Sequence, residues 1–188
     1  MKNAESDSEV LKFDKGKHHR RTVRLKDYDY SEEGAYFVTI CAHNRECLFG
    51  NISDGRMQLS RIGKVVEDCW KWLGDQYDYV YLDEWVIMPN HLHGIIVITD
   101  EDLGGSRTAP TKEFKHKPLG RLIGAFKTVS ARRIKDMRKS ATARVWQRNY
   151  YEHIVRNEKE LIGIREYIVN NPFTWDKDEE NPVRENRP

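Results

Sequence analysis

Two histidines separated by a single residue are the feature of this sequence with the clearest chemical potential. His91 and His93 lie in the run MPNHLHG at residues 88–94. In a β-strand, residues two apart point to the same side, so the two imidazoles would be presented together. Neutral imidazole nitrogens are common ligands of divalent metal ions. The pair is therefore a candidate metal site, although two hydrogen-bonded surface histidines would show the same spacing.

The residues around the pair narrow the choice of metal. A zinc site would be expected to add cysteines or histidines at a recognised spacing, and the sequence has none there. A nucleotide hydrolase of the histidine-triad type would have a third histidine at position 95, which is occupied by Ile95. Two imidazoles and one oxygen ligand from elsewhere in the chain favour Mg²⁺ or Mn²⁺, although imidazole is an unusual ligand for Mg²⁺.

Tyr167 and Asn171 form a second candidate group near the C-terminus. They are four residues apart and would share one face of a helix if the last helical turn persists to Asn171. A phenol can attack a phosphodiester and form a covalent bond to DNA, but its pKa of about 10 means that it needs a nearby cation at neutral pH. The Asn171 amide oxygen could complete the ligand set of that cation. Tyr150 and Tyr151 are rival nucleophiles, but their strand-like stretch favours packing or base stacking.

The hydrophobic pattern predicts the elements that must position these groups. Runs of β-branched and aromatic residues predict strands, and apolar residues at helical spacing predict helices. In chain order the prediction is a strand at 35–42, a turn region at 50–55, a helix at 59–77, strands at 79–88 and 91–99, a polar loop at 100–117, a helix beginning at Pro118, a strand at 145–155 and a helix at 159–169. Apart from the last helix, this order matches the βαββαβ arrangement of a ferredoxin-like fold, an α+β class with an antiparallel sheet. The last helix would cover the other face of the sheet and carry Tyr167.

The length and the charge distribution bound the class of protein. A chain of 188 residues with 38% hydrophobic residues suits one compact domain. We place this domain at 31–175, between a basic arm at 1–30 and an acidic tail at 176–188. The net charge is only +2, but residues 112–148 hold twelve lysines or arginines and two acids. Such segregation indicates a polyanionic partner, although ordinary solvated helix faces would give the same pattern.

The cysteines and the apolar runs indicate where the protein resides. Three cysteines without metal-type spacing fit reduced thiols better than a disulfide framework. The N-terminal segment has no apolar signal-peptide core, and no run reaches the length of a membrane span. We therefore expect a cytoplasmic protein that does not interact with a membrane.

Four motifs together resemble the single-tyrosine HUH transposase superfamily, which includes the insertion-sequence 200-like enzymes. The motifs are YFVTI at 36–40, MPNHLHG at 88–94, the stretch from Trp146-Gln147 to His153, and the segment from Tyr167 to Pro172. Within the superfamily, the sequence is most similar to the REP-associated tyrosine transposases. The resemblance extends from about residue 20 to residue 175, and the order and spacing of the motifs are more specific than any one of them.

The resemblance implies a site and a reaction. His91 and His93 would be the two histidines of the HUH motif, Tyr167 the nucleophile, and Asn171 a third ligand of Mg²⁺ or Mn²⁺. Members of the family cleave single-stranded DNA beside a hairpin, forming a 5′-phosphotyrosine and freeing a 3′-OH. REP-associated members act on short palindromic repeats in bacterial chromosomes. We therefore expect a bacterial, nucleoid-associated, metal-dependent endonuclease and strand transferase that acts as a monomer or a homodimer.

Basic and aromatic side chains in three segments are candidate contacts to DNA. Lysines and arginines would contact the phosphate backbone, and aromatic rings would stack on unpaired bases. The candidates are Arg20, Arg21 and Arg24 in the arm, Lys127, Arg132 and Arg133 on the second helix, and Trp146, Arg148 and Tyr150 in the last strand region. Two alternatives remain open. One is a non-catalytic module that binds DNA hairpins or acts as a repressor, and the other is an RNA-processing nuclease that uses water as its nucleophile.

Overall fold

The computed structural model describes residues 28–99, 116–139, 144–178 and 180–182. Its elements in chain order are β1 (Gly34–Cys41), the 3-10 helix η2 (His43–Arg45), β2 (Gly50–Ser53), β3 (Arg56–Leu59), α1 (Arg61–Gln76), β4 (Val80–Ile87), β5 (His91–Ile98), α2 (Leu119–Arg138), β6 (Tyr151–Val155), α3 (Glu158–Asn170) and the 3-10 helix η3 (Pro172–Lys177). The candidate arginines of the arm, Arg20, Arg21 and Arg24, and most of the predicted loop at 100–117 lie outside the described residues. Across the described part of the chain, no helix combines the length and the apolarity that crossing a bilayer would need.

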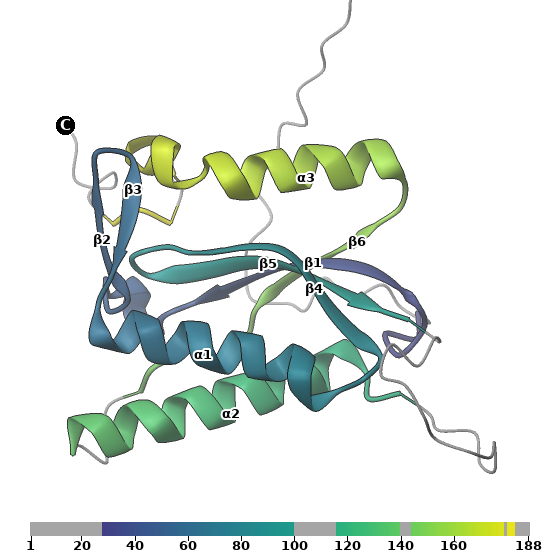
Figure 1. Ribbon diagram of the computed structural model, residues 1–188, viewed down its shortest axis with the longest axis horizontal. Helices are drawn as coiled ribbons and strands as arrows, with labels where there is room; N and C mark the ends of the chain where they lie inside the picture. The colour runs from purple at the N-terminus through teal and green to yellow at the C-terminus, as the bar shows by residue number, and fades with distance from the viewer. Residues whose placement is uncertain (1–27, 100–115, 140–143, 179, 183–188) are drawn as a thin grey trace, which may run out of the picture.

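A four-stranded antiparallel sheet forms the centre of the molecule (Figure 1), with the strand order β4-β5-β1-β6. The two central strands, β1 and β5, pair along their whole length, from Gly34 opposite Ile98 to Cys41 opposite His91. Together with α1 and α2, the four strands follow the βαββαβ order of a ferredoxin-like fold. The predicted α+β class and its antiparallel core are therefore confirmed.

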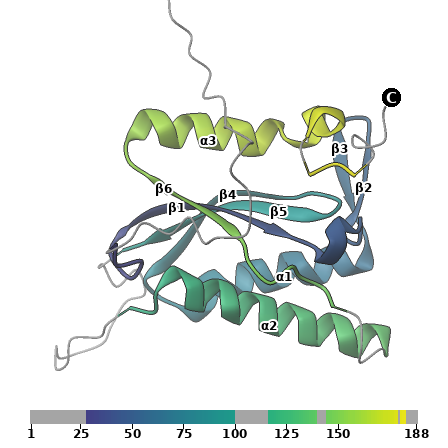
Figure 2. The same cartoon turned by 180° about the vertical axis from the view of Figure 1, so that it is seen from behind.

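Helices cover both faces of this sheet. Figures 1 and 2 show α1 and α2 together on one face and α3 on the other. Because side chains alternate along a strand, Tyr36 and Val38 of β1 belong to the main core beneath α1 and α2. Phe37, between them, packs on the opposite face with Ile164 and Ile168 of α3. The same alternation in β5 decides which side of the sheet each of its residues faces.

The predicted turn region at 50–55 is a β-hairpin. Strands β2 and β3 pair around a two-residue turn at Asp54 and Gly55. Both turn residues have positive φ angles, 52° and 69°, as the Asp-Gly turn of a two-residue hairpin requires. Strands of four residues carry too little alternation to be distinguished from a turn region, although the Asp-Gly dipeptide was a usable signal.

The strand predicted at 145–155 is irregular: Trp146 forms an isolated antiparallel bridge with Ala42, and the regular strand β6 begins at Tyr151. Upstream, the carbonyl oxygens of Gln147 and Asn149 each accept a hydrogen bond from Lys127 Nζ at 2.9 Å. These carbonyls are therefore bound to a side chain of α2 and not to a neighbouring strand. The pattern of β-branched and aromatic residues could not reveal this, because the competing donor is distant in the sequence.

The helix α3 is attached to the sheet by polar contacts as well as by its apolar side. Asn157 caps the first turn by accepting a hydrogen bond from the backbone N–H of Glu160 at 2.9 Å. Arg165 forms a two-pronged ion pair with Asp83 of β4, in which Nε lies 2.8 Å from Oδ1. The hydrogen bond from Arg165 lowers the pKa of the Asp83 carboxyl. The helix is thus held at a defined position over the sheet.

Gly94 provides a test of the packing at the centre of β5. A Cβ atom at this position would lie 2.6 Å from Cζ2 of the fully buried Trp70 and 3.2 Å from Cβ of Trp85. We expect Gly94→Ala to lower the free energy of unfolding by roughly 1–3 kcal/mol, because the added methyl group overpacks the core. Urea denaturation followed by circular dichroism would measure the change.

The matched control is Gly124→Ala on α2, where an added Cβ would meet no atom within 4 Å. Alanine has the higher helix propensity, so this variant should be more stable than the original chain by up to about 1 kcal/mol. If both substitutions shift the unfolding midpoint in the same direction, the packing argument for Gly94 is wrong.

Candidate active site

His91 and His93 lie at the start of β5, on the face of the sheet that α3 covers. Alternation along the strand places them on the same side as Ile95, which packs with Ile168 of α3. The two histidines are 0% and 3% exposed, and their ring centroids are 4.4 Å apart. The strand spacing thus brings the two imidazoles together, and it does so in the interior and not at the surface.

Asn90 determines which nitrogen of His91 carries the proton. The Asn90 amide nitrogen donates to the carbonyl oxygens of Arg45, at 3.1 Å, and Glu180, at 2.6 Å. Its amide oxygen is therefore the atom that lies 2.8 Å from Nδ1 of His91, and it accepts a hydrogen bond from that nitrogen. With the proton on Nδ1, Nε2 keeps a lone pair. This buried Nε2 has no hydrogen-bond partner among the described residues.

His93 is held between β1 and α3. Its Nδ1 lies 2.8 Å from the hydroxyl oxygen of Thr39, its partner in the β1–β5 pairing. Its Nε2 lies 3.2 Å from the hydroxyl oxygen of Tyr167. Phe37 stacks on the ring, with the centroids 5.5 Å apart. The imidazole therefore has a fixed orientation, with one nitrogen directed at the candidate nucleophile.

Burial keeps both histidines neutral. It lowers the pKa of His91 to about 3, and the positive charge of Arg45 lowers this pKa further in the same direction. Burial, followed by the neighbouring His91, holds the pKa of His93 well below its usual range. An imidazolium loses its hydration in such an environment, so the uncharged ring is favoured. Both rings can therefore offer lone pairs at neutral pH.

Tyr167 faces this pair from the last turn of α3. The residue is 45% exposed, yet its hydroxyl lies against the buried His93, and its ring centroid is 5.2 Å from that of the histidine. Burial of the hydroxyl raises the pKa of Tyr167, as do the negative charges of Asp178 and Glu180, while the Asn171 amide opposes the shift. The phenol is therefore accessible from one side but remains protonated.

Asn171 and Asp178 complete the cluster. Asn171 is 1% exposed, and its amide nitrogen donates to Oδ2 of Asp178 at 2.9 Å. Its amide oxygen is buried and has no partner among the described residues. The same Oδ2 of Asp178 lies 4.0 Å from Nε2 of His91. His91, His93 and Asp178 offer ligand atoms that all lie within 4.8 Å of one another, which makes them a candidate metal-binding group.

Sequence reasoning did not find Asp178. It lies in the segment assigned to an acidic tail, and helical spacing from Tyr167 cannot place it because α3 ends at Asn170. The 3-10 helix η3, which begins at Pro172, turns the chain after α3 and returns Asp178 to the histidines. An acid following a helix-terminating proline was the only available signal, and it is too common to be specific.

The candidate DNA-contacting cations divide into exposed and structural residues. Arg132 of α2 and Arg148 before β6 are exposed. Arg133 is also exposed, and it forms a side-chain hydrogen bond with the Cys69 thiol of α1. Lys127 is engaged by two backbone carbonyls, and burial lowers its pKa to about 8. The contact of Lys127 with the DNA backbone stays a prediction, but two of its three N–H groups are already engaged within the protein.

Trp146 also differs from its predicted role. Its ring belongs to the main core, where the centroids of Phe49 and Phe126 lie 5.1 and 5.3 Å away. Its indole N–H donates to the Ser130 hydroxyl at 2.9 Å. The tryptophan is only 9% exposed, so it has no free ring face for stacking on DNA bases. Tyr150 is half-buried against the same core, with Lys127 Nζ 5.7 Å from its ring centroid.

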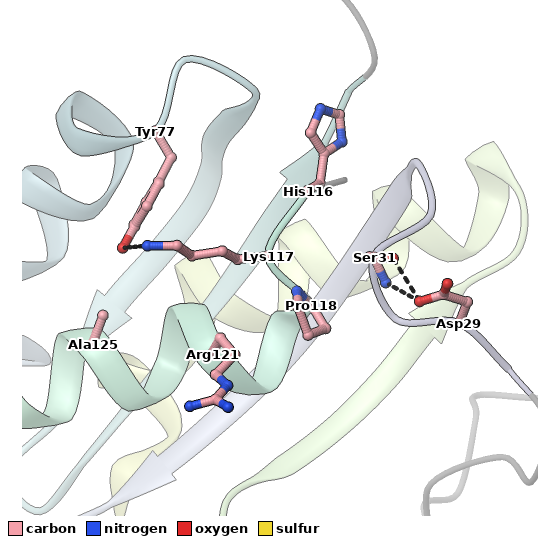
Figure 3. A pocket seen from close by; sticks show the side chains of 8 residues that line it. All are labelled: Asp29, Ser31, Tyr77, His116, Lys117, Pro118, Arg121 and Ala125. Carbon is pink, nitrogen blue, oxygen red and sulfur yellow. Dashed lines mark hydrogen bonds between the residues drawn. The ribbon is translucent and has the colours of Figure 1, made fainter. Parts of the chain in front are cut away.

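A cavity of about 570 Å³ lies at the N-terminal end of α2, and its walls share no residue with the histidine cluster (Figure 3). Its lining residues are Asp29, Ser31, Tyr77, His116, Lys117, Pro118, Arg121 and Ala125. Lys117 Nζ donates to the Tyr77 hydroxyl at 3.3 Å, and Asp29 accepts from Ser31. The cavity is therefore separate from the candidate site at His91 and His93.

The chain has relatives of similar sequence among known proteins. It matches no protein-family model. An uncharacterized protein of Haemophilus influenzae is 44% identical over 180 residues, which cover 90% of this chain and 97% of that protein. A second protein of that organism, named "Putative REP-associated tyrosine transposase", is 23% identical over 145 residues, covering 77% of this chain and 73% of its own length.

The fold has a counterpart among solved structures. A REP-associated tyrosine transposase bound to a REP hairpin superposes with a TM-score of 0.56 at 16% identity, over 82% of this chain and 74% of the other. The likeness at this level of identity concerns the fold, and it agrees with the order of motifs in the sequence. The chain therefore belongs to one family with the 44% identical Haemophilus influenzae protein, and it has the REP-associated tyrosine transposase fold that its motifs indicated.

Proposed function

We propose that this protein is a metal-dependent single-stranded DNA transesterase, which cuts and rejoins DNA beside a hairpin through a covalent bond to Tyr167. The observation that carries the proposal is the 3.2 Å contact between the Tyr167 hydroxyl and Nε2 of His93, inside a cluster of buried neutral histidines. The fold supports it, since the solved structural relative is a transposase bound to a REP hairpin. A DNA hairpin with a single-stranded flank is therefore the substrate to test.

The residues around His91 fit a divalent cation. Nε2 of His91 and the amide oxygen of Asn171 are buried without partners among the described residues, and an unpartnered buried polar atom costs about 1–3 kcal/mol. Two neutral imidazoles with carboxylate or amide oxygens suit Mn²⁺ or Mg²⁺. A cation held by His91 and His93, with an oxygen ligand from Asp178 or Asn171, would polarise the scissile phosphate and offset its charge.

Tyr167 supplies the nucleophile in this proposal. Its phenolic oxygen forms a bond to phosphorus while the bond from phosphorus to the 3′ oxygen breaks. The phenol loses its proton, and the departing oxygen gains one and leaves as a 3′-OH. The DNA end that carries the 5′ phosphate remains on the tyrosine, and attack by a 3′-OH reverses the step and joins strands.

The electrostatics of the site explain why the proposed reaction depends on a cation. The carboxylates of Asp178 and Glu180 raise the pKa of Tyr167, in addition to the effect of burial. The same charges would repel an incoming phosphate. Without a compensating positive charge, the phenol is a weak nucleophile in a site unfavourable to its substrate.

The nucleophile assignment is tested with a labelled hairpin that carries a single-stranded flank, incubated with Mn²⁺. We expect a covalent protein–DNA adduct that withstands denaturing electrophoresis. Tyr167→Phe should abolish it, because the attacking oxygen is removed. Tyr150→Phe is the matched control and should leave the adduct intact.

Three outcomes would redirect the proposal. An adduct that persists in Tyr167→Phe would show that another residue attacks. Cleavage without an adduct, most of all of RNA, would indicate a nuclease that uses water. Hairpin binding without cleavage of any substrate would favour a non-catalytic module.

Metal dependence is a separate prediction. EDTA should abolish adduct formation, and added Mn²⁺ should restore it. His91→Ala should reduce the rate by roughly 100-fold or more, because it removes a ligand and not merely a neighbour of one. Rates would be measured in single-turnover reactions, and a rate insensitive to EDTA would exclude the proposed role of the cation.

The exposed cations of α2 are expected to contact the DNA backbone. Arg132→Ala should weaken hairpin binding and reduce the dependence of log K on log salt by about 1 unit, as the loss of one phosphate contact does. Lys71→Ala on α1, where the lysine pairs with Glu67, serves as the control. Fluorescence anisotropy at several salt concentrations would measure both, and an unchanged slope for Arg132→Ala would remove α2 from the interface.

A further inference from the structure

We propose that Asp178, from the segment after α3, is the third protein ligand of the metal, and that Asn171 and Asn90 are positioning residues for it and for His91. This inference rests on the metal site of the proposed function. It assigns a role to a residue outside the recognised motifs, and it changes the role expected for Asn171.

Asp178 is buried beside the unpartnered nitrogen of His91. The residue is 8% exposed, and its Oδ2 lies 4.0 Å from the unpartnered Nε2 of His91. That separation is too long for a hydrogen bond. Two ligands that each lie about 2.0–2.2 Å from one ion are separated by about 3–4.3 Å, depending on the angle between them. The spacing therefore suits a shared cation better than a direct contact.

The hydrogen bonds of Asp178 define what Asn171 does. Oδ2 accepts from the Asn171 amide nitrogen at 2.9 Å, and Oδ1 accepts from the backbone N–H of Glu180 at 2.6 Å. Each carboxylate oxygen thus has one donor and retains a second lone pair. The Asn171 nitrogen cannot bind a cation, and its contact orients the carboxylate. The Asn171 amide oxygen, buried and without a partner among the described residues, is the rival ligand. A carboxylate also contributes a negative charge that an amide lacks, which strengthens the binding of a divalent ion.

The segment that supplies Asp178 is tied to the histidines by Asn90. The same Asn90 amide that sets the His91 tautomer donates to the Glu180 carbonyl. The carboxylate of Glu180 forms an ion pair with Arg45 at 2.9 Å. The ring of Trp175 in η3 lies 6.0 Å from that of His91. Asp178 therefore reaches the ligand set only when this segment packs against the histidines. A cation that binds there must also stabilise the packed segment.

Binding of Mn²⁺ to the full-length protein, measured by isothermal titration calorimetry, tests the proposal without reference to activity. We expect Asp178→Asn, which keeps the side-chain volume, to raise the Kd for Mn²⁺ by roughly 10–100-fold. Asp176→Asn is the matched control, because Asp176 is an exposed acid of the same segment. It should change the Kd by less than about twofold, as expected for a screened surface charge. Asn171→Ala should have an intermediate effect.

Hydrogen exchange gives a second readout. Mn²⁺ should slow exchange of the backbone amides of residues 173–178, 180 and 181 of the original chain, and Asp178→Asn should lose this protection while α3 and the sheet keep theirs. Circular dichroism and the unfolding midpoint of each variant without metal show whether it is folded.

The outcomes separate this inference from the proposed function. If Asp178→Asn binds Mn²⁺ as the original chain does while His91→Ala does not, the ligand assignment is overturned and the metal site stands. If the original chain itself binds no Mn²⁺, the metal-dependent function fails. If Asp178→Asn cuts DNA faster at unchanged Mn²⁺ affinity, the carboxylate obstructs the substrate and is not a ligand. A larger loss for Asn171→Ala than for Asp178→Asn would make the amide oxygen the ligand.

Discussion

The antiparallel pairing of β1 with β5 is the constraint on which both the core and the candidate site depend. Its register sets Thr39 opposite His93 and Val38 opposite Gly94. Thr39 and His93 face α3 and share a hydrogen bond, whereas the missing side chain of Gly94 leaves room for Trp70 on the other face. A slip of one residue would exchange the two faces, burying the histidines among apolar side chains and removing their partners. The observed register thus both places the histidines on the α3 face and leaves space for Trp70 in the core.

Burying two uncharged imidazoles side by side has an energetic cost that the surrounding polar groups only partly offset. Asn90 and Thr39 satisfy one nitrogen of each ring, and Tyr167 approaches the second nitrogen of His93. Among the described residues, Nε2 of His91 has no partner. Native proteins rarely leave such atoms unpaired, and the exceptions concentrate at binding sites. The unpartnered His91 nitrogen beside the Asp178 carboxylate is therefore the strongest structural support for a cation.

The position of α3 places Tyr167 against His93. The helix that carries Tyr167 is fixed by the Arg165–Asp83 ion pair and by Ile164 and Ile168 packing on Phe37. The histidines and the tyrosine therefore come from a single chain.

Apart from the β2–β3 hairpin, the sequence by itself determined the order of the main elements, the pairing of His91 with His93 and the placement of Tyr167 on a late helix. Each of these depends on local periodicity, because a strand alternates every two residues and a helix repeats every 3.6. The bounds of β5 and the start of α2 were predicted to within one residue, because both elements are long and strongly patterned. The recognised motifs added the expected chemistry, since they specify residue types at fixed spacings.

Only the tertiary structure decided which side chains are available and which distant residues join the site. Trp146 and Lys127 looked like DNA contacts, but the first fills the core and the second binds backbone carbonyls. Asp178 reaches His91 because η3 reverses the chain after α3. Burial, and a contact such as that between His91 and Asp178, 87 positions apart, produce no periodic pattern in a sequence. They depend on how the helices pack on the sheet. The residue types and spacings of the candidate site could therefore be predicted from the sequence, whereas the contribution of Asp178 could not.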